Sequence, residues 1–339
     1  MRSCLADGSS SGIEPLDLSV IIVSFNTRDL LAQCLKSLTS GDLRVRYEIL
    51  VVDNGSKDGS AEMVGLRFPD VILVRNAENL GFAKANNQAF AIARGRYLLL
   101  LNSDTVAQGD AIVALVAFLE IHPKAAVVGP RILNFDATLQ SKGCQAPSIR
   151  LMLWSLTTRV LPFKTRRVIA PQCFWHDDEV VQVGWLSGCC LLVRRAAVQT
   201  IGGLCEDFVF YGEETEWCYR ARKAGFEVWY FGQRMIRHLG GGSTIEPIPE
   251  ALQLENYKAL CRRTVGIAKA VAMSSVALAA RVFVLLHACL ATRDRKRRSN
   301  LFVQLRYEAK VIRHLLSKTT SRSEATRENP PDKQHATPT

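Results

Sequence analysis

The sequence predicts an α/β fold in which helices cover both faces of a mostly parallel central sheet. Apolar runs of strand length alternate with segments whose apolar residues recur at helical spacing, an order typical of parallel sheets. Polar clusters also follow three of the expected strands, at the edge where ligands bind to such sheets. These clusters are Ser24–Asn26, Asp53–Ser56 and Asn102–Asp104.

The elements of this fold can be placed in order along the chain. Residues 18–23 form a β-branched run typical of a buried parallel strand, and Thr27 can cap the helix that follows. Further strands are expected at 47–52, 71–74, 97–101 and 126–128, and further helices at 59–68, 83–93 and 109–121. After an irregular stretch at 131–181, order returns at 182–193, then in a helix that Gly225 closes and a strand at 226–230.

The composition is that of a globular protein with a core. Of 339 residues, 48% are hydrophobic and 22% charged, which excludes a disordered or fibrous chain. The net charge of +11 is concentrated near the end of the chain, where residues 289–339 include twelve basic and five acidic side chains. Such a segment can meet an anionic membrane or simply be solvated, and no nucleic-acid partner is expected.

The ten cysteines form no spaced framework and include no CxxC pair, so neither a zinc site nor a redox motif is expected. Most are interpreted as small buried residues in a reducing compartment. Residues 1–16 are expected to be a flexible leader without the apolar core of a signal peptide. The expected location is the cytoplasm, with peripheral contact at the inner face of the cell membrane as an option.

That option comes from residues 267–291, an apolar helix of bilayer-spanning length. Lys269 and Arg281 interrupt it, and an arginine near a bilayer centre costs about 2.5–3.5 kcal/mol. At ~100° per residue these two and Ser274 fall in one arc, and apolar residues such as Val282 in the other. The pattern favours an amphipathic helix on a membrane, or equally a helix packed on the protein's own core.

Asp53 and Asp104 are the first candidates for chemistry. A carboxylate just beyond a buried parallel strand can bind a ribose or a base, although Asp-Asn-Gly-Ser is also a common turn. The second polar turn, at Asn102–Asp104, favours a nucleotide site over a simple turn. Asp104 could coordinate Mg²⁺ or Mn²⁺, which prefer oxygen ligands beside substrate phosphates.

Phosphate binding cannot depend on a glycine-rich loop here. The chain has no GxGxxG after its first strand and no GxxxxGK[ST], which argues against a dehydrogenase or a P-loop enzyme. The helix start around Gly81, with Lys84 and Asn87, could supply amide and ammonium groups to a diphosphate. A plain capped helix with a solvated lysine remains the alternative.

The acidic cluster Glu213-Glu214-Thr215-Glu216 is the strongest candidate. Like charges held together raise at least one pKa, which suits a general base. A helix N-terminus, where the helix dipole favours acids, explains the cluster equally well and is compatible with catalysis. His238, between a strand and three glycines, could complete a metal site, although a lone histidine is more often structural.

Taken together, these motifs resemble the family 2 glycosyltransferases, and within them a rhamnosyltransferase-like subgroup, over about residues 18–245. No single motif is specific, but their order is. The matching segments are 20–26, 51–60, 79–87, 100–105, 129–130, 185–188, 202–204, 213–220 and 238–241.

The resemblance implies a GT-A fold at 17–248, with a nucleotide-binding half at about 17–130 and an acceptor half at about 131–248. C-terminal helices at 249–318, membrane-associated in one interpretation, and a disordered tail at 319–339 complete the expected layout. The implied reaction is an inverting transfer of a sugar from a nucleotide-diphosphate donor to a glycan or polyprenyl-linked acceptor, with a rhamnosyl donor and cell-envelope polysaccharide synthesis as the specific expectation.

The resemblance also assigns roles. Glu214 is the expected base, with Glu213 as its rival, because relatives often carry Asp where Glu214 stands. A divalent metal, Mg²⁺ or Mn²⁺, is expected at Asp104 and His238. The residues expected to hold the nucleotide sugar are Ser24, Phe25, Asn26, Asp53, Gly81, Lys84, Asn87, Asn102, Ser103 and Asp104. Those expected on the acceptor side are Trp185, Gly188 and Glu216.

Two other functions stay open at this point. A sugar nucleotidyltransferase shares a related scaffold but needs a basic loop near the N-terminus, for which residues 24–28 are poor. A non-catalytic carbohydrate-binding or membrane-binding protein could retain the fold, although Asp53, Asp104 and Glu214 argue against it. A processive synthase is not expected, because the chain has no QxxRW.

Overall fold

The computed structural model describes residues 16–40, 43–145, 176–208, 211–240, 250–291 and 295–317. The chain divides into two compact units, residues 1–147 with 170–245 and residues 148–169 with 246–339. Apart from Leu16, the expected leader lies outside the described residues, as do the expected tail at 319–339 and most of the irregular stretch at 131–181.

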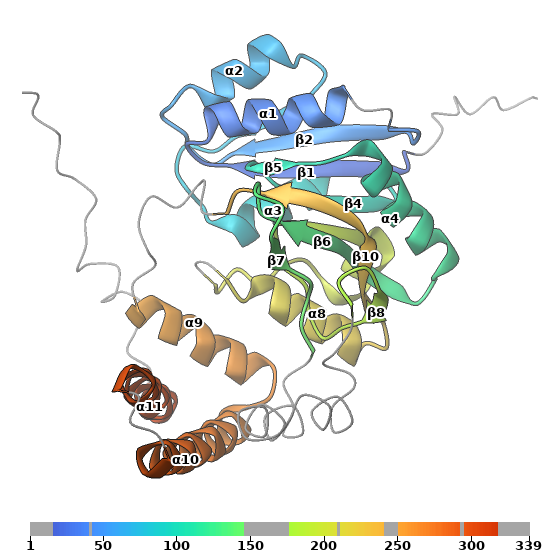
Figure 1. Cartoon of the computed structure of the whole chain (residues 1–339). Coiled ribbons are helices and arrows are strands. Elements are labelled where there is room, and N and C mark those ends of the chain that lie inside the picture. The colour runs from blue at the N-terminus through green and yellow to red at the C-terminus, as the bar shows by residue number, and fades with distance from the viewer. Residues whose placement is uncertain are drawn as a thin grey trace, which may run out of the picture. The chain divides into compact units, whose positions relative to one another are not determined.

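A ten-stranded sheet forms the first unit (Figure 1). Its central path runs β3-β2-β1-β4-β9-β6-β10-β5, with β7 paired to β6 and β8 to β10. The strands are β1 (Leu18–Ser24), β2 (Tyr47–Asp53), β3 (Ile72–Arg75), β4 (Tyr97–Asn102), β5 (Thr105–Val106), β6 (Ala125–Leu133), β7 (Leu139–Ser141), β8 (Val180–Gln182), β9 (Cys190–Arg194) and β10 (Glu227–His238).

Most strands run in one direction, as expected. β1, β2, β3 and β4 are mutually parallel, and β6 is parallel to β10. β9 lies antiparallel between β4 and β6, so β4 and β6 run in the same direction. The strands β1, β2, β3, β4, β6 and β10 therefore all run in that direction. The carboxyl ends of six strands therefore point to the same edge of the sheet, where ligands bind in open α/β folds.

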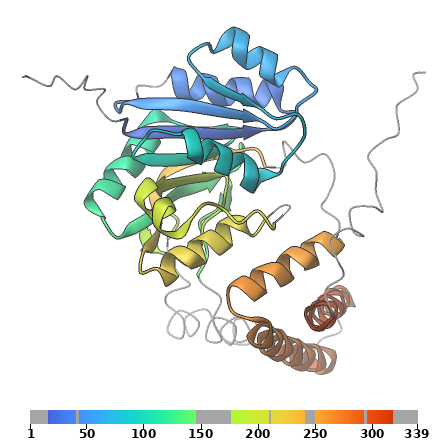
Figure 2. The ribbon, with the colours of Figure 1, turned by 180° about the vertical axis from the view of Figure 1, so that it is seen from behind.

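Helices cover both faces of the sheet because alternate strand residues point to opposite sides (Figures 1 and 2). One core contains Val20, Val51 and Leu99 under α1 (Arg28–Thr39), α2 (Ser60–Arg67) and α4 (Gly109–Ile121). The other contains Ile21, Leu50 and Leu98 under α3 (Phe82–Ile92), α7 (Arg195–Ile201) and α8 (Glu213–Lys223). The runs of buried residues in β1, β2 and β4 are what burial on both faces requires.

Two local expectations change. Thr27 stands at the N-cap of α1, but its side chain makes no capping hydrogen bond and instead bonds to other hydroxyl groups. The strand expected at 226–230 continues to His238, because an irregularity between Phe231 and Met235 lets it pair again with the end of β6. This longer strand carries His238 to the carboxyl edge of the sheet.

The second unit is described in three helices, α9 (Glu250–Arg263), α10 (Ile267–Ala291) and α11 (Arg295–Leu316). They share a small apolar core that includes Leu254, Ala270 and Val311. The two expected arcs of α10 do not separate an exposed face from a buried one: Ser274, in the polar arc, is 6% exposed, and Val282, in the apolar arc, is 41% exposed. Packing against α9 and α11 decides which face of α10 is covered. In the described part of the chain, no helix is long and apolar enough to cross a membrane.

Candidate active site

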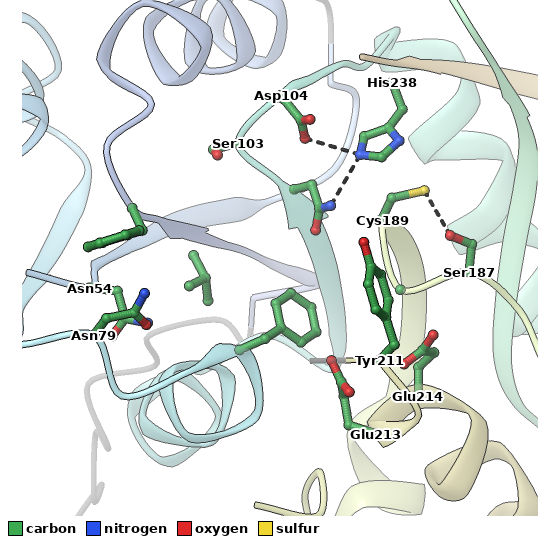
Figure 3. Close-up of a pocket in the computed structure, with 15 residues that line it drawn as sticks. Asn54, Asn79, Ser103, Asp104, Ser187, Cys189, Tyr211, Glu213, Glu214 and His238 are labelled. Atoms are coloured by element: carbon green, nitrogen blue, oxygen red, sulfur yellow. Dashed lines mark hydrogen bonds and ion pairs between the residues drawn. The ribbon is translucent and has the colours of Figure 1, made fainter. Parts of the chain in front are cut away.

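A cavity lies at the carboxyl edge of the sheet, where α8 begins and β10 ends (Figure 3). Its empty volume is about 970 Å³ when the part open to solvent is counted. The expected site residues that line it are Phe25, Asn102, Ser103, Asp104, Gly188, Glu213, Glu214 and His238.

A chain of hydroxyl groups joins the turn after β1 to the turn after β4. The Ser24 and Thr27 hydroxyls are 2.9 Å apart, and Thr27 Oγ1 donates to Ser103 Oγ at 2.9 Å. Thr105 Oγ1 donates to the carbonyl of Asn102 at 2.7 Å. These bonds hold the Asn102–Asp104 turn in place. Ser24 is not in the cavity lining and contacts the lining residue Ser103 through Thr27.

Asp53 and Asn26 connect the turns after β1 and β2. Asp53 Oδ1 accepts the backbone N–H of Ser56 at 3.0 Å, and Asn26, which is left-handed at φ 52°, accepts the N–H of Lys57 at 2.8 Å. Asp53 Oδ2 is buried and has no hydrogen-bond partner among the described residues. A buried acceptor without a donor suits a ligand that brings its own N–H or O–H. Neither residue is in the cavity lining.

Side-chain amides fix the rim of the cavity beside α3. Asn54 Nδ2 donates to Asn79 Oδ1 at 2.8 Å and to the carbonyl of Gly81 at 3.4 Å. Asn54 Oδ1 accepts the N–H of Leu80 at 3.1 Å and Nδ2 of Asn76 at 3.0 Å. Asn54 is 2% exposed, so this network holds the stretch before α3 rigidly against β2.

The three residues expected at the start of α3 lie outside the lining. Gly81 is the left-handed N-cap at φ 84°, and Lys84 is exposed. Asn87 binds a loop instead, because its Nδ2 donates to the carbonyl of Leu204 and its Oδ1 accepts the N–H of Leu204, both at 2.9 Å. A β-carbon at Gly203 would lie 2.3 Å from Asn87 Oδ1, so a larger residue there would displace the Asn87 amide.

Asp104 and His238 meet at the cavity. Nε2 of His238 lies 3.1 Å from Asp104 Oδ1 and 3.2 Å from Asn102 Nδ2. Nδ1 of the same ring lies 2.6 Å from Gln140 Oε1. The His238 side chain is only 11% exposed and the Asp104 side chain only 6%, so the surrounding protein sets their orientation.

These two residues fit a divalent cation. Neighbouring ligands of an octahedral ion, each at ~2.1 Å, are about 3 Å apart, and Asp104 Oδ1 and His238 Nε2 are 3.1 Å apart. Within the described residues, no group of three or more His, Cys, Asp or Glu side chains could hold a metal. A cation at this pair would therefore take further ligands from substrate phosphates, as Mg²⁺ commonly does.

Glu213 and Glu214 open α8 after Gly212, which is left-handed at φ 112°. They are 5% and 9% exposed. Burial, followed by the nearby charge of Glu214, raises the pKa of Glu213 to about 8, and burial also raises the pKa of Glu214. Glu214 Oε2 accepts the N–H of Gly212 at 3.3 Å, while Glu213 Oε2 has no partner among the described residues. Carboxyls with pKa values raised in this way are candidates for proton transfer at a catalytic site.

Glu216 is engaged elsewhere. Its two carboxylate oxygens accept from Nε of Arg220 at 2.8 and 2.9 Å. The same guanidinium donates to the carbonyls of Ile201 and, at 2.7 Å, Gly203. Glu216 is not in the cavity lining, so the acidic cluster splits into a pair at the cavity and a third member that anchors α8.

The comparison with known proteins decides the family. Residues 19–185 match the model described as glycosyl transferase family 2. The chain contains a glycosyltransferase family 2 domain. It is therefore an enzyme that transfers a glycosyl group from a nucleotide-activated donor.

One curated relative of this glycosyltransferase is N-acetylglucosaminyl-diphospho-decaprenol L-rhamnosyltransferase of Mycobacterium tuberculosis, with 29% identity over 243 residues. That match covers 67% of this chain and 77% of the relative. Among solved structures, GalNAc-T7 with UDP, GalNAc and Mn²⁺ aligns with a TM-score of 0.56 at 19% identity, over 73% of this chain and 48% of that one. The mannosyltransferase PcManGT of Pyrobaculum calidifontis, with GDP-Man and Mn²⁺, aligns at 0.51 and 17%, over 90% and 86%. Both structures support the GT-A fold expected for this glycosyltransferase.

The cavity leaves space beside Glu214, where the acceptor side of this glycosyltransferase is expected. A β-carbon at Gly188 would lie 3.7 Å from Glu214 Cδ, so the glycine leaves room next to the carboxyl. Trp185 is half-buried and lies outside the lining, and its backbone N–H donates to the carbonyl of Cys144 at 3.1 Å. Figure 3 places Ser187, Cys189 and Tyr211 around the same space.

Sequence reasoning missed part of this lining. The further residues are Val23, Asn54, Asn79, Phe82, Ser187, Cys189 and Tyr211. Asn54 and Asn79 stood inside recognised motifs, so their polarity was a usable signal. Tyr211 is 64% exposed, and its backbone is left-handed at φ 64°. No sequence pattern predicts its place in the lining.

Proposed function

We propose that this enzyme transfers a sugar, with inversion, from a nucleotide-diphosphate donor to a hydroxyl of a lipid-linked glycan acceptor. The proposed sugar is L-rhamnose and the proposed process is cell-envelope polysaccharide synthesis. The support for both is the similarity to the mycobacterial rhamnosyltransferase, whose name gives a decaprenyl-linked N-acetylglucosamine acceptor.

The observation that carries the proposal is the joint lining of one cavity by two functional pairs. Glu213 and Glu214 supply carboxyls with raised pKa values, and Asp104 and His238 supply a cation site. An inverting transfer needs a base on one side of the anomeric carbon and charge neutralisation of the leaving group on the other. The residues that line the cavity offer a candidate for each role.

In this proposal Glu214 is the base. Its carboxyl lies beside Gly188, where an acceptor hydroxyl has room to approach, and the N–H of Gly212 orients one of its oxygens. The raised pKa makes the carboxylate a stronger base than an exposed glutamate. Glu213, whose Oε2 has no hydrogen-bond partner in the described part of the chain, is the alternative base and otherwise holds a sugar hydroxyl.

The donor side uses the strand-end turns. Asp53 Oδ2 would accept a donor group of the nucleoside, next to the turn formed by Ser24, Phe25 and Asn26. Asn102 and Ser103, which line the cavity with Asp104, are proposed to face the diphosphate. Gly81, Lys84 and Asn87 are proposed to act through the shape and charge of the α3 start.

The residues proposed as metal ligands are Asp104 and His238. A divalent cation, Mg²⁺ or Mn²⁺, would neutralise charge on the departing diphosphate. Within the protein, Asn102 Nδ2 lies beside His238 Nε2 and keeps the ring directed at Asp104.

On the acceptor side, Trp185 and Glu216 are proposed as supports. Trp185 is tied to Cys144 next to the loop that carries Gly188. Glu216 fixes α8, and with it Glu214, against the Gly203 loop through Arg220.

We further propose that α11 meets an anionic membrane surface peripherally. Val303 and Tyr307 are 64% and 46% exposed, and Arg306 and Arg313 are exposed at neighbouring helical positions. Apolar and basic side chains together are typical of helices that lie on anionic bilayers. Lipid-linked acceptors reside in such membranes.

A donor and acceptor screen tests the function. The enzyme is incubated with Mn²⁺, a panel of nucleotide sugars including activated L-rhamnose, and a polyprenyl-diphosphate-linked N-acetylglucosamine. The proposal expects a disaccharide lipid and free nucleoside diphosphate, with rhamnose the preferred sugar. Release of pyrophosphate from nucleoside triphosphate and sugar phosphate would instead indicate a nucleotidyltransferase, and binding without turnover would indicate a non-catalytic protein.

Flotation with vesicles tests the membrane contact. The wild type should float with vesicles containing anionic phospholipid and not with neutral ones. The double variant Arg306→Glu/Arg313→Glu should lose flotation, while the matched change at two exposed lysines of the first unit, Lys36→Glu/Lys124→Glu, should keep it. Equal flotation by both variants would contradict the assignment to α11.

A further inference from the structure

A relay of hydrogen bonds runs from the β6–β7 turn to the proposed metal ligand His238. Thr138 Oγ1 donates to Asp136 Oδ1 at 2.6 Å, and Asn134 Nδ2 donates to Thr138 Oγ1 at 2.8 Å. Gln140 Nε2 then donates to Asn134 Oδ1 at 2.7 Å. Gln140 Oε1 lies 2.6 Å from His238 Nδ1.

Each step of this relay fixes the direction of the next. Hydrogen bonds from the Thr138 side chain and backbone lower the pKa of Asp136, so its carboxylate can only accept. The Thr138 hydroxyl must give its proton to Asp136, so toward Asn134 it can only accept. Asn134 must therefore turn its NH₂ group to Thr138 and its oxygen to Gln140.

The same logic reaches the imidazole. Gln140 must turn its NH₂ group to Asn134, and its second N–H donates to the carbonyl of His238 at 3.2 Å. Both amide hydrogens are then used, and only Oε1 is left to face Nδ1. A carbonyl oxygen can only accept, so the Gln140 contact favours a proton on Nδ1. Nε2 faces the amide donor Asn102 Nδ2 at 3.2 Å, which also favours a bare Nε2, and the Asp104 carboxylate at 3.1 Å, which competes for the proton.

We propose that Gln140 is a positioning residue that holds His238 in the Nδ1–H tautomer, so that Nε2 presents its lone pair to a divalent cation shared with Asp104. The inference rests on the metal-dependent function proposed above. Histidine ligands commonly donate their other ring N–H to an oxygen, which fixes the tautomer and the ring orientation. Here the ring is oriented by Gln140 in β7, and three residues of the preceding turn orient Gln140. None of these three, Asp136, Thr138 and Asn134, lines the cavity.

The test reads the tautomer directly in the metal-free full-length protein. ¹⁵N NMR of histidine-labelled enzyme distinguishes a protonated ring nitrogen from a bare one, and spectra recorded over a range of alkaline pH show which nitrogen of His238 keeps its proton. The His238 signals are assigned by their loss in His238→Asn. The proposal expects the proton on Nδ1, and a wild-type ring protonated at Nε2 would overturn it.

Variants of Gln140 separate acceptor from donor. Gln140→Glu keeps an acceptor at Nδ1 and should keep the tautomer, whereas Gln140→Lys offers only donors and should move the proton to Nε2. Affinity for Mn²⁺ alone, measured by EPR of the free ion, should fall about 10-fold to 100-fold in Gln140→Lys. Gln145→Leu, on a nearby glutamine that bonds to Gln182 instead, should match wild type.

The far end of the relay gives an independent check. Thr138→Val removes the acceptor for Asn134 and should allow Nε2–H rings to appear, while Thr138→Ser should not. An unchanged tautomer in both Gln140→Lys and Thr138→Val would overturn the proposal. A proton on Nδ1 of His238 in a protein without transferase activity would count against the proposed function alone. A proton on Nε2 in a protein that is an active, metal-dependent transferase would count against the relay alone.

Discussion

The carboxylate of Glu216 and the guanidinium of Arg220 form an ion pair one helical turn apart, with both oxygens of Glu216 within 2.9 Å of Nε. Glu216 is 3% exposed, so Arg220 compensates a buried charge. This pair removes Glu216 from the acidic cluster and leaves Glu213 and Glu214 to act at the cavity.

Arg220→Gln should destabilise the enzyme by about 2–4 kcal/mol, because a buried carboxylate loses its partner and two loop carbonyls lose a donor. Urea unfolding at pH 7 measures the change. The double variant Glu216→Gln/Arg220→Gln should recover part of the loss, since it buries no charge. Equal stability of wild type and Arg220→Gln would contradict the anchoring role.

Glu213→Gln should stabilise the enzyme at alkaline pH. The folded pKa of about 8 lies above the unfolded value of about 4.3, so this residue's contribution to stability is complete below pH 4.3 and is lost as pH rises through 8. The variant should therefore exceed wild type by a growing margin between pH 5 and 9, on the order of a few kcal/mol. Unfolding free energies at several pH values test this, and a pH-independent difference would contradict it.

As the pH is lowered, the transfer rate should begin to fall at a higher pH than it would with an ordinary glutamate as the base. The base must be ionised, and burial raises the pKa values of both carboxyls, so the loss should begin well above the ~4.3 of an ordinary glutamate. The two groups titrate as a coupled pair, so the profile reports the pair. A kcat/KM profile from pH 5 to 9 tests this, and full activity retained at pH 5 would contradict it.

Chelation should abolish transfer. If Asp104 and His238 hold a divalent cation, excess EDTA should remove activity and added Mn²⁺ should restore it. Asp104→Asn should weaken Mn²⁺ binding and lower kcat while the protein remains folded, as judged by circular dichroism. Full activity in excess EDTA would remove Asp104 and His238 from this role.

Much of the fold followed from the sequence because it rests on patterns that tertiary contacts do not override. Leu18–Ser24 and Tyr97–Asn102 are buried on both faces, and continuous apolar runs such as theirs are typical of strands buried in this way. The end of β10 was missed because Gln233 and Arg234 interrupt its apolar run, and only pairing with β6 carries the strand to His238.

The site was predictable where its residues cluster in sequence and less so where they meet in space. Glu213, Glu214 and Asp104 stood in recognisable motifs and line one cavity. Gln140 reaches His238 across 98 positions of the chain, and no local pattern marks it. Asn87 lies in a motif, yet its amide binds Leu204, a partner 117 positions away.

The central claim is that Glu214 is the base of a glycosyl transfer, and one paired measurement tests it most directly. Transfer turnover and donor affinity are measured for wild type, Glu214→Gln and, as the matched control, Glu213→Gln, with Mn²⁺ and the donor that the screen selects. The account predicts that Glu214→Gln binds donor nearly as wild type but loses turnover by about 10²-fold to 10⁴-fold, while Glu213→Gln loses less. Near-normal turnover by Glu214→Gln would contradict the account.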